Sequence, residues 1–200
     1  TAREWFATTL ASERGVACSA QDLGALGRQV AEDFVVLHRP HKNADRAVWV
    51  HVCFPSGWRP ERILGRSFLE IHSSIPEFEG IARGASGLVD AMVERGPYVR
   101  FVWTIAADDH LDHHPEQGQR VPWSDLTREG FLRVERQVTV PLPAANASVF
   151  LIRTHLYRFE ELTSLARATL AGALELMPAA LLRYKGLERA LPHALRLLAS

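Results

Sequence analysis

Two long stretches of alternating polar and apolar residues, 131–143 and 147–159, constrain the fold more than any other feature of the chain. Alternation with a period of two predicts β-strands, because successive side chains of a strand point to opposite faces of the sheet. Only a short turn, PLPAAN, joins the two stretches, so we expect the strands to pair antiparallel. One face of the first strand is predicted to carry Leu132, Val134, Arg136, Val138 and Val140.

Three further strands are predicted, at 34–40, 47–55 and 97–107. The first two flank the polar turn RPHKNADR and resemble a hairpin. Helical spacing of apolar residues predicts helices before, between and after these strands. The helical segments are 1–13, 19–34 (with Ser19 and Asp22 placed for a capping box), short helices from Pro60, 76–96, 160–177 and, after a break at Pro178, 179–199.

This order of elements predicts an α+β fold with a five-stranded antiparallel sheet and helices inserted after its second strand. A PAS-like half-barrel is one fold with that order. We interpret residues 1–200 as a single domain, with N-terminal helices over 1–33, a PAS-like core over 34–158 and C-terminal helices over 159–200.

Charge and composition exclude several classes of function. The chain has 23 basic and 23 acidic residues and a formal net charge of zero, which does not favour a nucleic-acid partner. No apolar run approaches the ~18 residues of a membrane span, and we expect no secretory leader and no membrane association. The two cysteines, Cys18 and Cys53, form no CxxC pattern, and the interpretation is free or buried thiols in a reducing cytoplasm.

Histidine and aspartate are concentrated in the segment DDHLDHHPE, which starts at Asp108. His110 and His114 have the i, i+4 spacing of zinc ligands on a helix. The surrounding residues are typical of a loop, however, and no HExxH motif is present. Two hypotheses stay open for this segment: a solvated loop, or a loop that binds a metal or substrate.

His72 is an isolated histidine in the apolar stretch FLEIHSSIP. One interpretation is a core or surface histidine with its hydrogen bonds satisfied. The other is an axial ligand of haem iron, because a lone imidazole in an apolar pocket is typical of such a ligand.

Several arginines lie in the alternating strands. Arg136 shares its predicted face with leucine and valine and is expected to point inward, whereas Arg133 and Glu135 are expected to point the other way. Arg153 shares a partly apolar face in the neighbouring strand. Such arginines indicate either a structural ion pair, for instance with Glu135, or a site for a haem propionate or an anionic substrate.

Six stretches of the chain occur together in an order that resembles a known family. They are VAEDFVVL, VCFPSGW, LGRSFLEIHSSIP, LRVERQVTVPLP, VFLIRTHL and LLRYKGL. The set resembles the haem-binding oxygenase (alpha) subunit of the haem-dependent oxidative N-demethylase family. The likeness extends from about Gly27 to Leu187.

The resemblance implies a PAS-like fold that holds haem b, activation of O₂ and oxidative removal of a methyl group from a small amine. Electrons would come from a separate flavin and iron–sulfur reductase, and the protein would act in the cytoplasm, in a homo- or hetero-oligomer. Two rival functions stay open: a haem-binding PAS sensor without catalysis, and a non-haem metal enzyme that uses the Asp108–His114 loop.

The resemblance also implies roles for particular residues. His72 is expected to ligate the iron, and Glu135 and Arg136 are the expected catalytic residues. The expected contacts to the cofactor come from Arg133, Gln137, Arg153 and Trp103. The chain departs from the family pattern at Gly57, at Ser74 and in VTVPLP, where the family has an arginine, a proline and two arginines, and these departures predict a different substrate or redox partner.

Overall fold

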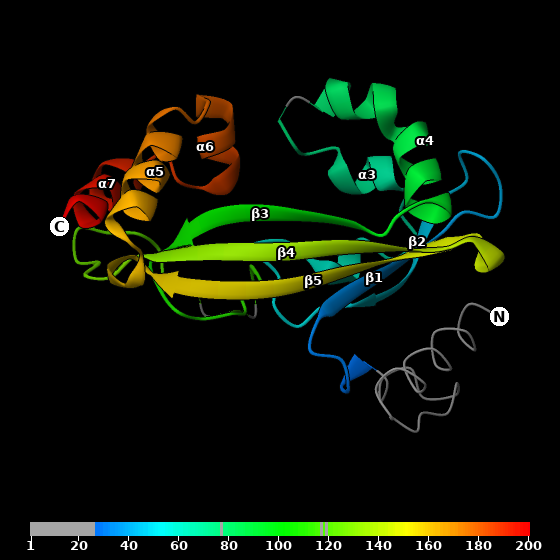
Figure 1. Cartoon of the computed structure of the whole chain (residues 1–200), viewed down its shortest axis with the longest axis horizontal. Helices are drawn as coiled ribbons and strands as arrows, with labels where there is room; N and C mark the ends of the chain where they lie inside the picture. The colour runs from blue at the N-terminus through cyan, green and yellow to red at the C-terminus, as the bar shows by residue number, and fades with distance from the viewer. Residues whose placement is uncertain (1–26, 77, 117, 119) are drawn as a thin grey trace.

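A computed structural model of the chain describes residues 27–76, 78–116, 118 and 120–200. Figure 1 shows a sheet of long strands with helices gathered at its two ends. The strands are β1 (Asp33–His38), β2 (Arg46–His51), β3 (Tyr98–Ala106), β4 (Phe131–Leu142) and β5 (Ala147–Arg158). The α-helices are α3 (Phe68–His72), α4 (Phe78–Glu94), α5 (Ser164–Glu175), α6 (Ala179–Lys185) and α7 (Leu191–Ala199). Short 3-10 turns are η1 (Pro60–Arg62), η2 (Pro143–Ala145) and η3 (Phe159–Glu161).

The five strands form one antiparallel sheet in the order β2-β1-β5-β4-β3. The predicted α+β architecture and the β4–β5 hairpin are therefore confirmed. The hairpin turns through η2, and Asn146 takes the left-handed conformation (φ 47°) that asparagine tolerates well. β2 and β3 lie at the two edges of the sheet.

The two faces of the sheet can be followed along β4. We call the face that carries Arg133, Glu135 and Gln137 face A, and the face that carries Val134 and Arg136 face B. Residues that are paired directly across antiparallel strands share a face. Arg100 of β3 therefore lies on face A beside Gln137, whereas Phe101 and Arg153 lie on face B beside Arg136.

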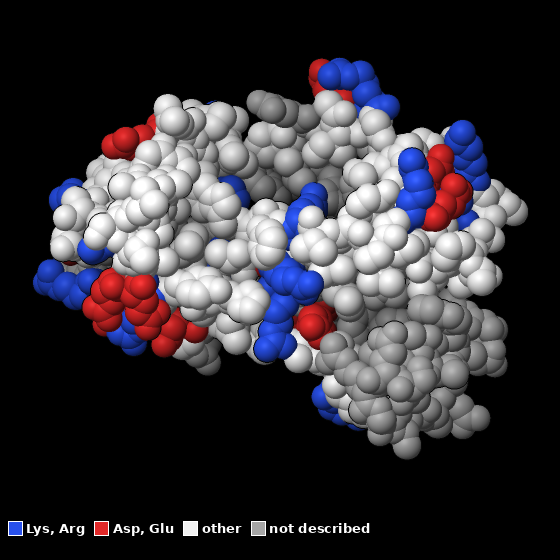
Figure 2. All heavy atoms as spheres, viewed as in Figure 1, with Lys and Arg blue, Asp and Glu red and all other residues white. Residues whose placement is uncertain are grey.

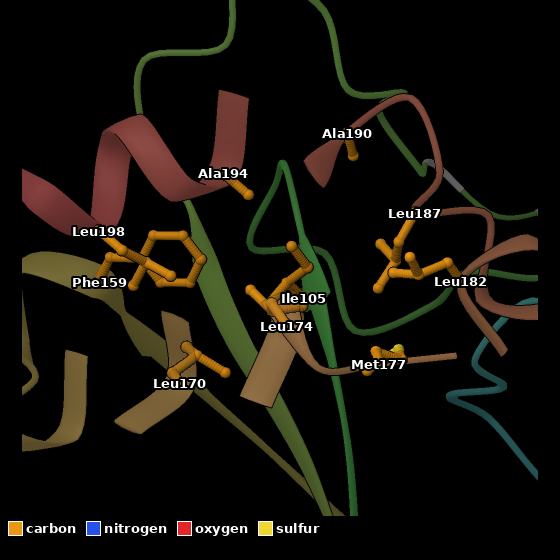
Figure 3. Packing of buried hydrophobic residues seen from close by; sticks show 10 residues of the cluster. All are labelled: Ile105, Phe159, Leu170, Leu174, Met177, Leu182, Leu187, Ala190, Ala194 and Leu198. Carbon is orange, nitrogen blue, oxygen red and sulfur yellow. The ribbon is translucent and has the colours of Figure 1, made fainter. Parts of the chain in front are cut away.

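Apolar side chains pack on both faces. On face B, Ile105 belongs to a cluster formed with the C-terminal helices (Figure 3). Trp103 and Leu132 pack against this cluster. At the other end of face B, Phe34 and Val36 pack with residues of β5. On face A, Leu37 packs against Val89 and Val93 of α4. Since β1 is buried from both faces, its run of apolar residues lacks the alternation of an exposed strand.

Two predicted helix boundaries are wrong. The helix predicted over 19–34 cannot reach Phe34, which lies in β1. Residues 19–26 are outside the described residues. The carboxylate of Asp33 accepts hydrogen bonds from the backbone N–H groups of Cys53 and Phe54, which fixes the start of the strand. Tertiary contacts therefore override the helical spacing that ended at Phe34.

The helix predicted over 179–199 is divided into α6 and α7. Gly186 ends α6 in the left-handed conformation (φ 68°), and Leu187 N–H then donates to the carbonyl of Leu182. This is a glycine-based C-cap, in which the missing Cβ removes the steric penalty of a positive φ. The predicted break at Pro178 is confirmed, because Pro178 stands at the N-cap of α6.

Among the described residues, no single helix is long and apolar enough to cross a membrane. Only α5 and α6 taken together reach the required length and composition, and their axes meet at 109°.

Candidate functional site

His72 is the last residue of α3, a helix of five residues whose start is fixed by several hydrogen bonds. Ser67 and Glu70 form a capping box, in which each side chain bonds to the other residue's backbone N–H. Asp45, which is buried, accepts a hydrogen bond from Phe68 N–H at 2.5 Å. Because Asp45 directly precedes β2, these bonds attach α3 to the sheet and set the position of His72.

The imidazole of His72 is held in one tautomer. Its Nδ1 lies 2.7 Å from the carbonyl oxygen of Phe68, and a carbonyl only accepts, so Nδ1 carries the proton. The ring also lies against the ring of Phe68, with 4.1 Å between centroids. Nε2 is left with a lone pair and with no hydrogen-bond partner among the described residues.

The charge state of His72 is also set by its surroundings. Burial lowers the pKa of His72, the hydrogen bond to Phe68 opposes this, and the positive charge of Arg100 lowers it further. The ring is therefore neutral at pH 7. A neutral imidazole with one nitrogen hydrogen-bonded to a backbone carbonyl and the other open is the arrangement of histidines that ligate metals.

Face A carries a continuous chain of polar side chains, and one end of it, Arg100, lies near enough to His72 to lower the pKa of that histidine. Arg100 Nε donates to Gln137 Oε1 at 2.6 Å, and Gln137 Nε2 donates to Glu135 Oε2 at 2.8 Å. Ser56 Oγ–H donates to Glu135 Oε1 at 2.7 Å, and Ser56 in turn accepts from Arg133 Nε at 2.6 Å. The carboxylate of Glu135 thus stands in the middle of a chain of hydrogen bonds that leads toward His72.

Helix α6 brings two more polar residues to this region from beyond the edge strand. Lys185 Nζ donates to the backbone carbonyl of Trp103 at 2.9 Å, which attaches α6 to β3. Burial lowers the pKa of Lys185, and the negative charge of Glu135 opposes the shift. Partial burial and the charge of Glu135 both raise the pKa of Tyr184. Figure 1 shows α3 and α6 above the same edge of the sheet.

Arg133 is buried (1% exposed), which contradicts the prediction that Arg136 is the inward residue of this pair. Its guanidinium donates to the carbonyls of Phe54 (2.9 Å), Leu111 (2.8 Å) and His110 (3.3 Å), besides Ser56. Arg133 therefore joins two loops to the sheet, and its donors are engaged by the protein itself.

Arg136 and Arg153 are exposed and directly opposite each other on face B. The prediction that Arg136 points inward is wrong, because the middle of face B is uncovered. Nor does Arg153 pair with Glu135, which lies on the other face. It donates to the carbonyl of Ala31 at 3.2 Å. The structure does not bring either arginine together with His72.

The remaining predicted residues are divided between the faces. Gln137 lies on face A within the polar chain. Trp103 offers this region only its backbone carbonyl, because its side chain packs on face B against the C-terminal helices.

The histidine-rich segment forms a closed loop. His113 and Asp108 make a buried hydrogen bond between Nε2 and Oδ1 of 2.8 Å. Burial raises the pKa of Asp108, but hydrogen bonds from His113, Val121 N–H and His110 N–H outweigh it and lower the pKa. Across 27–76, 78–116, 118 and 120–200, no three His, Cys, Asp or Glu side chains converge as a metal site. The loop instead packs against the 52–58 loop, since His113 N–H donates to the carbonyl of Pro55 and the His113 carbonyl accepts from Gly57 N–H.

Several residues of the site were not predicted from the sequence: Asp45, Ser56, Arg100, Tyr184 and Lys185. One signal was available, because Lys185 is one of two lysines in the chain and stands in the RYKG stretch. Tyr184 stands beside Lys185 in the same stretch, whereas Asp45, Ser56 and Arg100 are polar residues of loops or strands that come together only when the sheet forms.

Two hollows lie beside these elements, and neither contains His72 or Glu135. One, of about 400 Å³, is lined by residues of α3 and α4 and by the turn before β2, including Asp45 and Phe68. The other, of about 580 Å³, is lined by Ile75 and by the first turns of α4.

Cys53 is a free, exposed thiol, and Cys18 lies outside the described residues.

Comparison with known protein families gives a match over nearly the whole chain. Residues 4–195 match the model of a family described as haem-dependent oxidative N-demethylase, alpha subunit-like. The match includes every residue of the polar chain and His72.

Proposed function

The chain belongs to the haem-dependent oxidative N-demethylase, alpha subunit-like family, and from this premise we propose that it binds haem b and oxidises a small amine with O₂. The proposed reaction removes an N-methyl group. One N-methyl C–H bond becomes C–OH, the C–N bond then breaks, and formaldehyde and the demethylated amine leave. The second oxygen atom leaves as water, which consumes two electrons and two protons.

The observation that carries this proposal is the state of His72. A haem ligand must be neutral, oriented and free at one nitrogen, and His72 meets these three conditions through burial, the Phe68 carbonyl and the open Nε2. Arg100 and Lys185 are cations near the same edge of the sheet, and they are suitable partners for the carboxylates of a haem. The residues present therefore fit the cofactor that the family name implies.

We propose that the fold is PAS-like and that residues 1–200 act as one domain. The strand order β2-β1-β5-β4-β3, with α3 and α4 inserted between β2 and β3, supports this description. Helix α3 then supplies the iron ligand, and face A supplies the polar groups around it.

In this mechanism bound haem supplies the activation of O₂, with electrons from a separate flavin and iron–sulfur reductase. His72 Nε2 ligates the iron, and the Nδ1–H bond to Phe68 keeps the ring from rotating and raises its basicity. Glu135 holds or moves a proton at its two carboxylate oxygens, where Ser56 Oγ–H and Gln137 Nε2–H keep it oriented. Arg100 orients Gln137 from the other side.

Absorption spectroscopy and an amine turnover assay test the proposal. Protein supplied with haem is expected to show a Soret band and, with an electron donor, to release formaldehyde from secondary or tertiary N-methylamines. A Soret band without turnover of any such amine would favour a haem-binding sensor. Bound zinc or iron with no haem uptake would favour a non-haem metal enzyme.

We further propose a cytoplasmic protein that works in a multi-component assembly, as its alpha-subunit family name suggests.

A further inference from the structure

A row of three exposed side chains crosses face B at the middle of the sheet. Phe101 of β3 pairs with Arg136 of β4, and Arg136 pairs with Arg153 of β5. Phe101 is 65% exposed, and both arginines are exposed. Val99 (52%) and Tyr157 (43%) are exposed apolar residues on the same face. We call these five residues the face B patch.

The charge distribution of the patch is unfavourable for the isolated chain. Two arginines directly opposite each other on neighbouring strands repel, which destabilises a sheet. Within the described part of the chain, neither arginine forms a salt bridge, and Arg153 bonds only to the Ala31 carbonyl. Figure 2 shows basic side chains over the middle strands, surrounded mainly by uncharged atoms, with one acidic group at the margin. The paired positive charges are therefore available to an external group.

The patch has the composition of a protein interface. Arginine and aromatic residues are enriched in the parts of interfaces that contribute most to binding, and guanidinium groups bind carboxylates through paired hydrogen bonds. A second copy of this chain docked through the same patch would bring four arginines into one interface, because both partners of a twofold interface contribute the same surface. The positive charge therefore disfavours self-association through this patch and favours an acidic partner.

The position of the patch indicates what the partner does. Arg136 stands between Glu135 and Gln137 on β4, so the patch lies directly across one sheet layer from the polar chain of face A. We propose that the face B patch is the docking surface for an acidic electron-donor protein that supplies the electrons of the reaction. This inference rests on the proposed function for the identity of the partner, and on the arginine pair for its charge.

A reduced, acidic plant-type ferredoxin serves as the probe. Its association with the haem-loaded protein is measured by calorimetry at low and high ionic strength, and its transfer of electrons is followed by the Soret band. Wild type is expected to bind at low ionic strength and to lose affinity with salt. The Arg136→Glu/Arg153→Glu double variant is expected to bind about tenfold more weakly or worse.

Three controls make the result specific. Arg136→Glu alone places a carboxylate opposite Arg153, which relieves the repulsion, so this variant keeps the fold and is expected to show part of the loss. Arg189→Glu changes an exposed arginine between α6 and α7 and is expected to bind like wild type. Reduction by dithionite, which needs no docking, is expected to be the same in all variants.

Two kinds of result overturn the inference: wild type that does not bind the ferredoxin in a salt-dependent way, or a double variant that binds as well as wild type. Loss of haem from the double variant also overturns it, since the arginines would then serve the cofactor. If wild type takes up no haem, the proposed function fails, whereas the same calorimetric comparison made on the haem-free proteins still reports on the patch.

Discussion

Nδ1 of His72 donates its hydrogen to the carbonyl oxygen of Phe68, four residues earlier and 2.7 Å away. This bond decides which nitrogen of the ring is free, and it is made within a single helix, so it does not depend on a partner or a cofactor. The helix itself is attached to the sheet through Asp45 and Phe68 N–H. The orientation of the proposed iron ligand is therefore set before any cofactor binds.

Replacement of His72 is expected to remove the proposed iron ligand without unfolding the chain. His72→Ala should lose or shift the Soret band of the haem-loaded protein, and its circular dichroism should match wild type. His41→Ala, at an exposed histidine in the β1–β2 turn, is the matched control and should keep the wild-type spectrum. An unchanged Soret band in His72→Ala would assign the iron to another residue.

Asp45 is expected to act on haem through the position of α3. Asp45→Ala removes the acceptor of the Phe68 N–H bond, so α3 should become less ordered and His72 less well placed. Transfer of haem to apomyoglobin should be faster than in wild type, by about tenfold for a lost bond to a charged group. Asp45→Asn, which keeps a carbonyl oxygen as acceptor, should recover part of the difference. Equal transfer rates in all three proteins would show that α3 does not depend on Asp45.

Glu135 is expected to be needed for turnover rather than for binding of haem. In Glu135→Gln the side-chain amide oxygen can still accept a hydrogen bond from Ser56. The amide has no carboxylate group, so it cannot take up and release a proton. Formaldehyde release should fall by about 10² to 10⁴ in kcat, the usual contribution of a general acid or base, while the Soret band stays unchanged. Asp109→Asn, at an exposed carboxylate of the histidine-rich loop, is the control. Full activity in Glu135→Gln would remove Glu135 from the chemistry.

Arg133 and Arg136 are expected to differ sharply in their effect on stability. Arg133→Ala leaves the carbonyls of Phe54 and Leu111 without their donor and a void in the interior, which should cost about 3 kcal/mol or more in the free energy of unfolding. Arg136→Ala, at an exposed position, should change it by less than about 0.5 kcal/mol. Urea unfolding of the two variants measures the difference, and similar values would contradict the assignment of the two faces.

The buried histidine of the loop is expected to make stability depend on pH. Burial lowers the pKa of His113 from its ordinary value of 6.5, although the bond to Asp108 opposes the shift. An unfolded chain therefore binds the proton more readily, and His113 destabilises the fold as the pH falls below 6.5. Asp108, whose pKa is lowered, adds a loss only as the pH falls below its ordinary value of 3.8.

Thermal unfolding of the haem-free protein between pH 7.5 and 5 tests this sign. The melting temperature should fall with pH in wild type and fall less in His113→Gln, where the amide N–H can still donate to Asp108. A fall of the same size in both proteins would show that His113 does not cause it.

The strands could be predicted from the sequence, because alternation and a short turn are local properties. The orientation of β4 could not. Hydrophobic alternation assigned Arg136 to the interior, but loops from 52–58 and 107–113 cover face A, while the middle of face B is open. Both faces of this strand carry charged residues, so only the packing of distant segments decides which one is buried.

His72 could be proposed as a ligand from a short stretch of sequence, whereas the polar chain of face A could be found only in the tertiary structure. Ser56 lies 79 residues before Glu135, and Arg100 lies 37 residues before Gln137. No spacing rule joins residues so far apart. Phe34 illustrates the opposite error, since its helical spacing was real in the sequence but was overridden by its burial between β2 and β5.

Adjacent residues on β4 serve opposite sides of the sheet, and this has an evolutionary consequence. A substitution at the exposed Arg136 alters the surface of face B, while Arg133, Glu135 and Gln137 on face A are left in place. Evolution can therefore change the surface of face B at Arg136 without changing the polar residues of face A.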